Sequence, residues 1–116
     1  MPIPLGSLSE YLSLGEGNTP VVSMPKISSM FETEIYGKLE FMNPTGSFKD
    51  RGTAMMISAL KSKGVSEIVE DSSGNAGASV SAYATRAGMK AHIFAPLSAP
   101  QTKLNQIKVY GSILHA

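Results

Sequence analysis

One stretch of this chain reads Asn43-Pro44-Thr45-Gly46-Ser47-Phe48-Lys49-Asp50-Arg51-Gly52. It places Lys49 where an extended segment gives way to a helix, although a cation in the first helical turn is unfavourable by about 0.3–1 kcal/mol. A helix that served stability alone would begin with Asp or Glu. Where a helix terminus and partial burial lower the proton affinity of a lysine, its amine can act as a nucleophile and form a Schiff base. The alternative interpretation of Lys49 is a solvated charge run on a loop.

A second strand-to-helix junction reads Glu70-Asp71-Ser72-Ser73-Gly74-Asn75-Ala76-Gly77-Ala78-Ser79. Ser72 and Ser73 can cap the following helix, while Gly74 and Gly77 permit a close approach of the backbone. Free N–H groups and hydroxyls would then surround an anion at the positive end of that helix. Taken alone, the serines are also compatible with simple N-capping, and Asn75 with a turn residue. The presence of two such junctions in one chain favours a binding site.

Three glycines, Gly64, Gly88 and Gly111, recur at spacings of 24 and 23 residues. Each follows a helix-like segment with basic residues near its end and precedes a short apolar run, as expected of helix C-caps. The pattern predicts strands at about 66–71, 90–95 and 112–115, all parallel in one sheet. The predicted fold class is therefore α/β, a Rossmann-like three-layer αβα arrangement with a short parallel sheet.

Helices are predicted at about 50–63 and 75–87, with a third that begins at Ser98. Gln101 lies three residues after Ser98, as in a capping box, and Pro100 would occupy the first turn. The side chains expected to be buried on these helices are Ala54, Met56, Ile57, Leu60, Val80, Tyr83, Leu104, Ile107 and Tyr110. Segment 34–42 suggests a strand, and residues 1–29 are expected to be mostly irregular.

The amino-acid sequence of the two junctions resembles that of the threonine synthase family of pyridoxal-phosphate enzymes, fold type II. The resemblance starts near Leu14, includes Gly15–Pro20, and continues through Lys103–Gly111. It implies that Lys49 carries the cofactor, pyridoxal 5'-phosphate, as a Schiff base and shuttles protons at the substrate carbons. It implies that Asn75 donates a hydrogen bond to the phenolic oxygen of the cofactor. The residues implied to hold the substrate carboxylate are Ser72, Ser73, Gly74 and Asn75.

The reaction implied by this resemblance is that of a lyase: phosphate is eliminated from O-phosphohomoserine and water is added, which gives threonine. The combination Ser-Phe-Lys-Asp-Arg-Gly with Ser-Ser-Gly-Asn-Ala-Gly favours threonine synthase over cysteine synthase or threonine dehydratase. A non-catalytic module that retains the fold is a further alternative. In the full-length family, residues 1–48 would belong to the large domain and residues 49–116 to the small one.

The length of 116 residues allows one domain with a modest core. Members of the family are several times longer, and a glycine-rich loop later in their chains holds the cofactor phosphate. None of the eleven glycines here lies in a Gly-Gly-Gly run. We therefore interpret the chain as a truncated N-terminal portion that is inactive alone and binds pyridoxal phosphate weakly if at all. Because the missing part would leave apolar surface uncovered, we also expect a homo-oligomer.

The composition, with 42% hydrophobic and 16% charged residues and a net charge of +1, is typical of a soluble globular protein. Scattered basic residues argue against a nucleic-acid partner, and the N-terminus has no long apolar stretch that would indicate a membrane or secretion signal. The absence of cysteine excludes disulfides and is compatible with a cytoplasmic location. The expected ligand is a small amino-acid substrate. We expect no metal at His92 or His115, and Lys103 is either a solvated helix lysine or a contact for a substrate phosphate.

Overall fold

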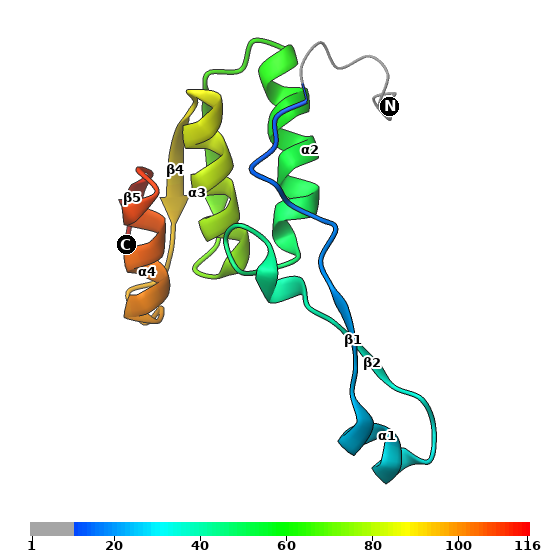
Figure 1. Cartoon of the computed structure of the whole chain (residues 1–116). Coiled ribbons are helices and arrows are strands. Elements are labelled where there is room, and N and C mark those ends of the chain that lie inside the picture. The colour runs from blue at the N-terminus through cyan, green and yellow to red at the C-terminus, as the bar shows by residue number, and fades with distance from the viewer. Residues whose placement is uncertain (1–10) are drawn as a thin grey trace.

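The computed structural model describes residues 11–116 (Figure 1). Its elements in chain order are β1 (Val21–Ser23), α1 (Pro25–Phe31), β2 (Tyr36–Lys38), the 3₁₀ helix η2 (Glu40–Met42), α2 (Lys49–Ser62), β3 (Glu67–Asp71), α3 (Asn75–Ala87), β4 (Lys90–Phe94), α4 (Gln101–Val109) and β5 (Ile113–His115). β1 and β2 form an antiparallel pair, and β3, β4 and β5 form a three-stranded sheet. Residues 1–10, which belong to the segment expected to be irregular, lie outside the described part of the chain.

The three-stranded sheet is parallel throughout, which confirms the prediction from the glycine repeat. β4 lies in the middle, with Val69 of β3 beside His92 on one side and Ile113 of β5 beside His92 on the other. α3 connects β3 to β4, and α4 connects β4 to β5. The chain therefore has the strand–helix–strand crossovers of an α/β protein.

Glycines end the helices where the sequence predicted them to. The φ angle is +76° at Gly64, +73° at Gly88 and +93° at Gly111, values that side chains with a Cβ rarely adopt. The last turn of each of these helices carries one basic residue that complements the negative helix end, namely Lys61, Arg86 and Lys108.

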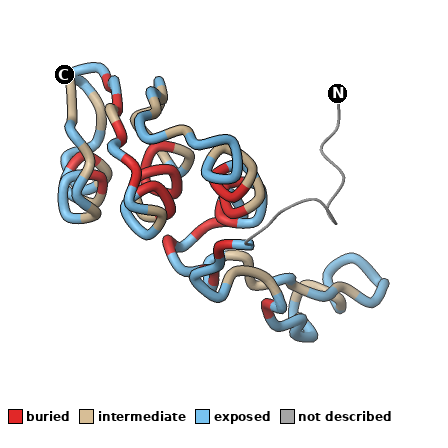
Figure 2. The backbone as a smooth tube through the Cα atoms, turned by 90° about the horizontal axis from the view of Figure 1, so that it is seen from above, coloured by how far each residue is buried: buried red, intermediate tan, exposed pale blue. Residues whose placement is uncertain are grey.

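The core surrounds α3, which packs against α2 on one side and against β3, β4 and α4 on the other. Buried residues gather along these contacts in Figure 2. The largest apolar side chains that are fully buried are Tyr83, Ile57, Ile93 and Ile107. Full burial of such a side chain stabilises the fold by about 1.5–3 kcal/mol. Met56 was expected in the core but is 41% exposed, because it lies off the stripe that buries Ala54 and Ile57.

One face of the parallel sheet carries no helix in residues 11–116. Along β4, Ala91 and Ile93 are buried toward α3, and the alternate residues point to the other face. That second face, here called the outer sheet face, includes Val69, Phe94 and Ile113, which are 69%, 45% and 40% exposed. The α/β class and the short parallel sheet are confirmed. Of the three expected layers, residues 11–116 contain the sheet and the helices on its inner face.

β1, α1 and β2 form an arm that extends away from the rest of the chain (Figure 1). None of the residues in these three elements is buried. The strand expected over 34–42 is limited to Tyr36–Lys38, because the chain turns into η2 at Glu40. α1 was not predicted, since Pro25 at its N-terminus is a weak signal in a proline-rich segment.

The start of α4 differs from the prediction. The helix begins at Gln101, and Pro100 is its N-cap residue without a side-chain hydrogen bond. The expected capping box at Ser98 is therefore wrong, because Ala99 N–H donates to the Pro96 carbonyl and closes a separate turn before the helix. Of the core positions expected on α4, Leu104 and Ile107 are buried, with exposed fractions of 6% and 0%, and Tyr110 is partly buried against the core.

Candidate active site

Lys49 is the first residue of α2, as the sequence predicted. The Ser47 hydroxyl accepts a hydrogen bond from the Lys49 backbone N–H at 3.3 Å. The Lys49 side chain is exposed, and its Nζ lies 5.0 Å from the centre of the Phe48 ring. The partial burial expected for this lysine is therefore not present in the described residues, and its amine is accessible to a ligand.

Asp50 holds the start of α2 in place from a fully buried position. Its carboxylate accepts hydrogen bonds from Thr45 N at 2.7 Å, from Thr45 Oγ1 at 2.5 Å and from Ser79 Oγ at 2.6 Å. Because a buried carboxylate is costly unless it is hydrogen-bonded, these three donors stabilise its charged form. The contact with Ser79 joins the lysine loop to α3. The donors to Asp50 come from Thr45 and Ser79, and not from the neighbouring Arg51.

Arg51 pairs instead with Glu40 on η2. Its Nε and Nη2 lie 2.9 Å from the two carboxylate oxygens of Glu40, a two-point contact that also includes Thr19 Oγ1. The hydrogen bond from Arg51, with a further one from Thr19, lowers the pKa of Glu40 to about 2. This cluster ties the lysine motif to the Gly15–Pro20 segment.

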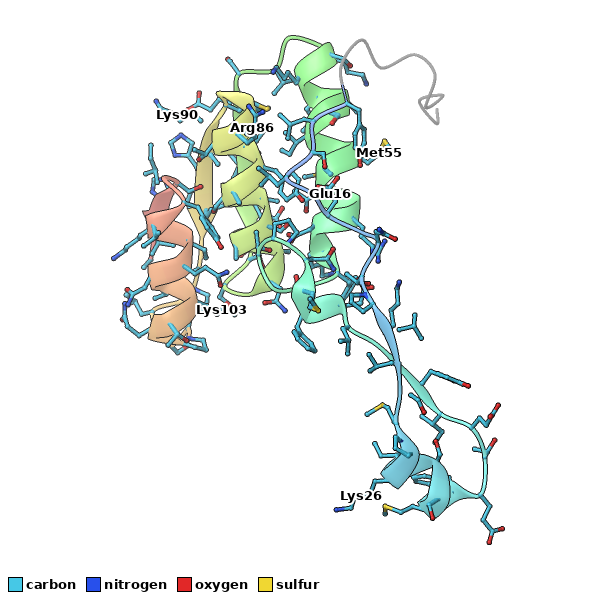
Figure 3. All side chains as sticks on the ribbon, in the orientation of Figure 1. Glu16, Lys26, Met55, Arg86, Lys90 and Lys103 are labelled. Carbon is cyan, nitrogen blue, oxygen red and sulfur yellow. The ribbon has the colours of Figure 1, made fainter. Side chains whose placement is uncertain are left out.

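Asn43 makes a second connection between the same two segments. Its Oδ1 accepts a hydrogen bond from Gly17 N–H at 2.9 Å, and its Nδ2 donates to the Glu40 carbonyl at 2.7 Å. Next to Gly17, Glu16 accepts a hydrogen bond at 2.6 Å from the phenol of Tyr83, whose pKa is raised by burial and by this carboxylate. Figure 3 shows Glu16 close to α2 and α3. The N-terminal motif therefore supports the lysine loop and α3.

The loop between β3 and α3 contains Ser72, Ser73 and Gly74. Gly74 is the N-cap residue of α3, and its N–H donates to Ser72 Oγ at 3.3 Å. The expected capping of α3 by Ser72 or Ser73 is therefore wrong, because the N-cap residue is a glycine without a side chain. The positive end of α3 is consequently formed by backbone groups, as an anion site requires.

Of the two glycines expected to allow a close approach, Gly77 does so. A Cβ at Gly77 would collide with the Ser72 carbonyl oxygen and lie 3.3 Å from Ile107 and Ile93. At Gly74 no atom of the described chain lies within 4 Å of such a Cβ, so a close approach of the backbone to an anion there stays a prediction. Gly77 thus lets the loop fold back onto the first turn of α3, and Gly74 faces open space.

Asn75, the first residue of α3, is held from α4. Lys103 Nζ donates to Asn75 Oδ1 at 2.6 Å and to Gln106 Oε1 at 3.1 Å. Gln106 Nε2 in turn donates to the Thr45 carbonyl at 3.0 Å. Figure 3 shows Lys103 on the side of α4 that faces the start of α3. Lys103 is therefore not a plain solvated lysine, and α4 links the two motif loops.

The two junctions meet in space as well as in sequence pattern. α2 and α3 pack side by side, and each begins at its lower end in Figure 1, on the side from which the arm extends. Lys49 and Asn75 open these helices, so an exposed amine and a side-chain amide lie beside two positive helix ends. The sequence analysis did not identify the supporting residues Thr45, Ser79 and Gln106. Gln106 could have been found, because residues three apart on a helix are neighbours and it lies three residues after Lys103.

Two other features lie apart from this site. A cavity of about 530 Å³, lined by Tyr11, Leu12, Ser13, Lys61 and Arg86, is near the opposite ends of α2 and α3. On the outer sheet face, His92 contacts Glu67 at 2.6 Å and His115 at 2.9 Å. Within residues 11–116 no group of three residues is arranged to hold a metal ion, and no helix is long and apolar enough to cross a membrane.

An accessible lysine can bond to a carbonyl carbon, and the adjacent helix N-termini favour a negatively charged group beside it. The family described as pyridoxal-phosphate dependent enzyme matches residues 12–116, and this chain belongs to that family. A threonine synthase of Bacillus sp. (strain ULM1) is 42% identical over 111 residues, which are 95% of this chain and 32% of that protein. A probable cysteine synthase of Bacillus subtilis (strain 168) is 35% identical over 83% of this chain and 32% of its own length.

The fold agrees with this assignment. The structure of maize serine racemase superposes with a TM-score of 0.78 at 36% identity, over 84% of this chain and 30% of that one. The α/β fragment is thus one of the pyridoxal-phosphate fold type II, in which the full-length enzymes use pyridoxal phosphate. This chain spans about a third of the length of the curated relatives that it matches.

Proposed function

We propose that this chain supplies the amine and the amide of a pyridoxal-phosphate site, and that the enzyme containing it makes threonine from O-phosphohomoserine and water. The observation that carries the proposal is the pairing of Lys49 and Asn75 at the starts of two adjacent helices, which the Asp50–Ser79 hydrogen bond joins. The choice of reaction is supported by the 42% identity to a threonine synthase.

The donors on this chain fit the chemistry of the cofactor. The exposed amine of Lys49 can bond to an aldehyde carbon, and the amide of Asn75 can donate to a phenolic oxygen. The positive ends of α2 and α3 favour negatively charged groups beside them. When bound, the cofactor supplies an electron sink for the charge that develops on the substrate carbons.

Each residue of the site has a separate role in this proposal. Lys49 holds the cofactor and moves protons at the substrate carbons. Asn75 orients the cofactor ring through its phenolic oxygen. Ser72, Ser73 and Gly74, with the amide of Asn75, hold the substrate carboxylate through hydroxyls and the backbone N–H groups at the start of α3. Such fixed donors stabilise a carboxylate without having to reorganise during the reaction.

A second candidate is a synthase that forms cysteine on the same scaffold. It is supported by the probable cysteine synthase, which is 35% identical over 83% of this chain, against 42% over 95% for the threonine synthase. Both candidates use Lys49 and Asn75 in the same roles, so only the substrate separates them.

We further propose that residues 1–48 belong to the large domain and residues 49–116 to the small domain of the full-length enzyme. The arm of β1, α1 and β2, without a buried residue, agrees with a segment that packs on another part of the protein. For the chain of 116 residues alone we expect weak cofactor binding and no turnover, because the exposed Lys49 is open to water.

The reaction can be tested in a chimera, in which this chain replaces the matching third of the Bacillus threonine synthase. Purified chimera is assayed for phosphate release from O-phosphohomoserine, for cysteine formation and for threonine dehydration. The proposal expects phosphate release and threonine formation, with both abolished in the matched Lys49→Arg chimera. Cysteine formation without threonine formation would favour the second candidate.

A further inference from the structure

Lys103 lies in a continuous series of hydrogen bonds that crosses the site. The series runs from the Thr45 carbonyl through Gln106 to Lys103 and ends at Asn75 Oδ1. It connects the loop before Lys49 with the first residue of α3 by way of two side chains on one face of α4 (Figure 3).

The two fixed partners in this series determine the direction of every bond in it. An ammonium group only donates and a backbone carbonyl only accepts. The amide of Gln106 must therefore turn its Nε2 to Thr45 and its Oε1 to Lys103. For the same reason Asn75 must turn Oδ1 toward Lys103, so that its Nδ2 donors face away from the ammonium.

The contact between Lys103 and Asn75 is short and charge-assisted. The 2.6 Å distance between Lys103 Nζ and Asn75 Oδ1 is short for a hydrogen bond. Because the donor is charged, such a bond is about twice as strong as one between neutral groups. Lys103 is partly buried against α3, whereas Asn75 is exposed at the helix start. The lysine is thus the better fixed of the two partners and sets the orientation of the amide.

We propose that Lys103 is a positioning residue: it orients the Asn75 carboxamide so that Nδ2, rather than Oδ1, is offered to an acceptor oxygen. The inference rests on the proposed function, in which that acceptor is the phenolic oxygen of pyridoxal phosphate. If the amide were reversed, Asn75 Oδ1 would face the phenolic oxygen, and two acceptors would then lie against each other. In this proposal Lys103 acts through its hydrogen bond to Asn75.

Three substitutions at Lys103 test whether the orientation of the Asn75 amide requires a partner that only donates, or any partner that forms a hydrogen bond. Lys103→Arg keeps a group that only donates, Lys103→Gln can both donate and accept, and Lys103→Met does neither. Lys108→Met, on the exposed side of the last turn of α4, is the matched control for loss of a lysine from this helix.

The orientation is measured without cofactor on the isotope-labelled full chain by NMR. The side-chain carboxamide signals of Asn75 are assigned by their loss in Asn75→Ala. We expect these signals to be unchanged in Lys103→Arg and Lys108→Met, and to move toward random-coil positions in Lys103→Met and Lys103→Gln. Wild-type carboxamide signals in folded Lys103→Met would overturn the proposal; if that variant does not fold by circular dichroism, Lys103→Gln decides in the same way.

A second measurement uses pyridoxal phosphate in excess, followed by borohydride reduction and mapping of the modified lysine. We expect the yield at Lys49 to fall about tenfold in Lys103→Met and to be restored in Lys103→Arg. Equal yields in wild type and Lys103→Met would contradict the inference. No modification of Lys49 in the wild type would instead contradict the proposed function, and the NMR measurement would still decide the orientation of Asn75.

Discussion

Ser79 donates a hydrogen bond of 2.6 Å to the fully buried carboxylate of Asp50, and this contact fixes the start of α2 against α3. Asp50 directly follows Lys49, and Ser79 lies one turn after Asn75. The two residues proposed to hold the cofactor are therefore each next to one partner of a buried hydrogen bond. This contact therefore joins the two helix starts that carry the candidate site residues.

Replacement of Asp50 by Asn is expected to lower the free energy of unfolding by about 2–4 kcal/mol, because an amide cannot accept from all three donors that surround the carboxylate. Urea denaturation followed by circular dichroism measures the change. Asp71→Asn, at an exposed position at the end of β3, is the control and should change stability by less than about 0.5 kcal/mol. Equal stability of the two variants would contradict the structural role of Asp50.

The Arg51–Glu40 pair predicts a loss of stability in acid. Since the pKa of Glu40 is lowered to about 2 from an ordinary value of 4.5, its stabilising effect is complete above pH 4.5 and is lost as the pH falls toward 2. In Glu40→Gln this part of the pH dependence should be missing. The measurement is the urea midpoint of both proteins between pH 6 and pH 2, and parallel curves would show that the pair contributes nothing.

Glycine at position 77 is required by space and not by its backbone angles. Gly77→Ala is expected to lower stability by about 1–3 kcal/mol, because the new Cβ meets the Ser72 carbonyl and must displace the loop. Gly52→Ala is the matched change in α2, where nothing lies within 4 Å, and should raise stability by about 0.5–1 kcal/mol. Thermal denaturation of both variants tests the pair of signs, and a stabilised Gly77→Ala would refute the close approach.

The outer sheet face predicts self-association of this chain. Val69, Phe94 and Ile113 are all at least 40% exposed on one side of the sheet, and an apolar patch of this kind favours contact with another surface. We expect a dimer or larger species in sedimentation velocity, and Phe94→Lys should shift the distribution to smaller species. A wild-type monomer at high protein concentration would count against the prediction.

The sequence predicted the parts of the fold that depend on local pattern. Gly64, Gly88 and Gly111 located three helix ends, and the apolar runs after them located the strands of the parallel sheet. Helix starts were predicted less well: α4 was placed from Ser98, whose hydroxyl fits a capping box, but the preceding turn moves the start to Gln101. The residue types alone do not show that the chain forms a turn at Pro96–Ala99 before the helix begins.

In the candidate site, too, some residues could be predicted from local sequence pattern and others could not. Lys49 and Asn75 could be singled out because each stands at a strand-to-helix junction in a distinctive motif. Their supports could not, since the partner of Asp50 is Ser79 and the partner of Lys103 is Asn75, and each pair is separated by more than 25 residues. Such contacts follow from the packing of α3 against α2 and α4, which no local pattern specifies.

The most direct test of this account is the identity of the lysine that takes up pyridoxal phosphate. The full chain is incubated with excess cofactor and reduced with borohydride, and the modified lysine is mapped by mass spectrometry, with Lys49→Arg as control. We predict weak uptake, seen only with excess cofactor, with Lys49 modified in preference to exposed lysines such as Lys26 and Lys63. Modification spread evenly over the exposed lysines, or unchanged in Lys49→Arg, would contradict the assignment of Lys49 as the amine of the site.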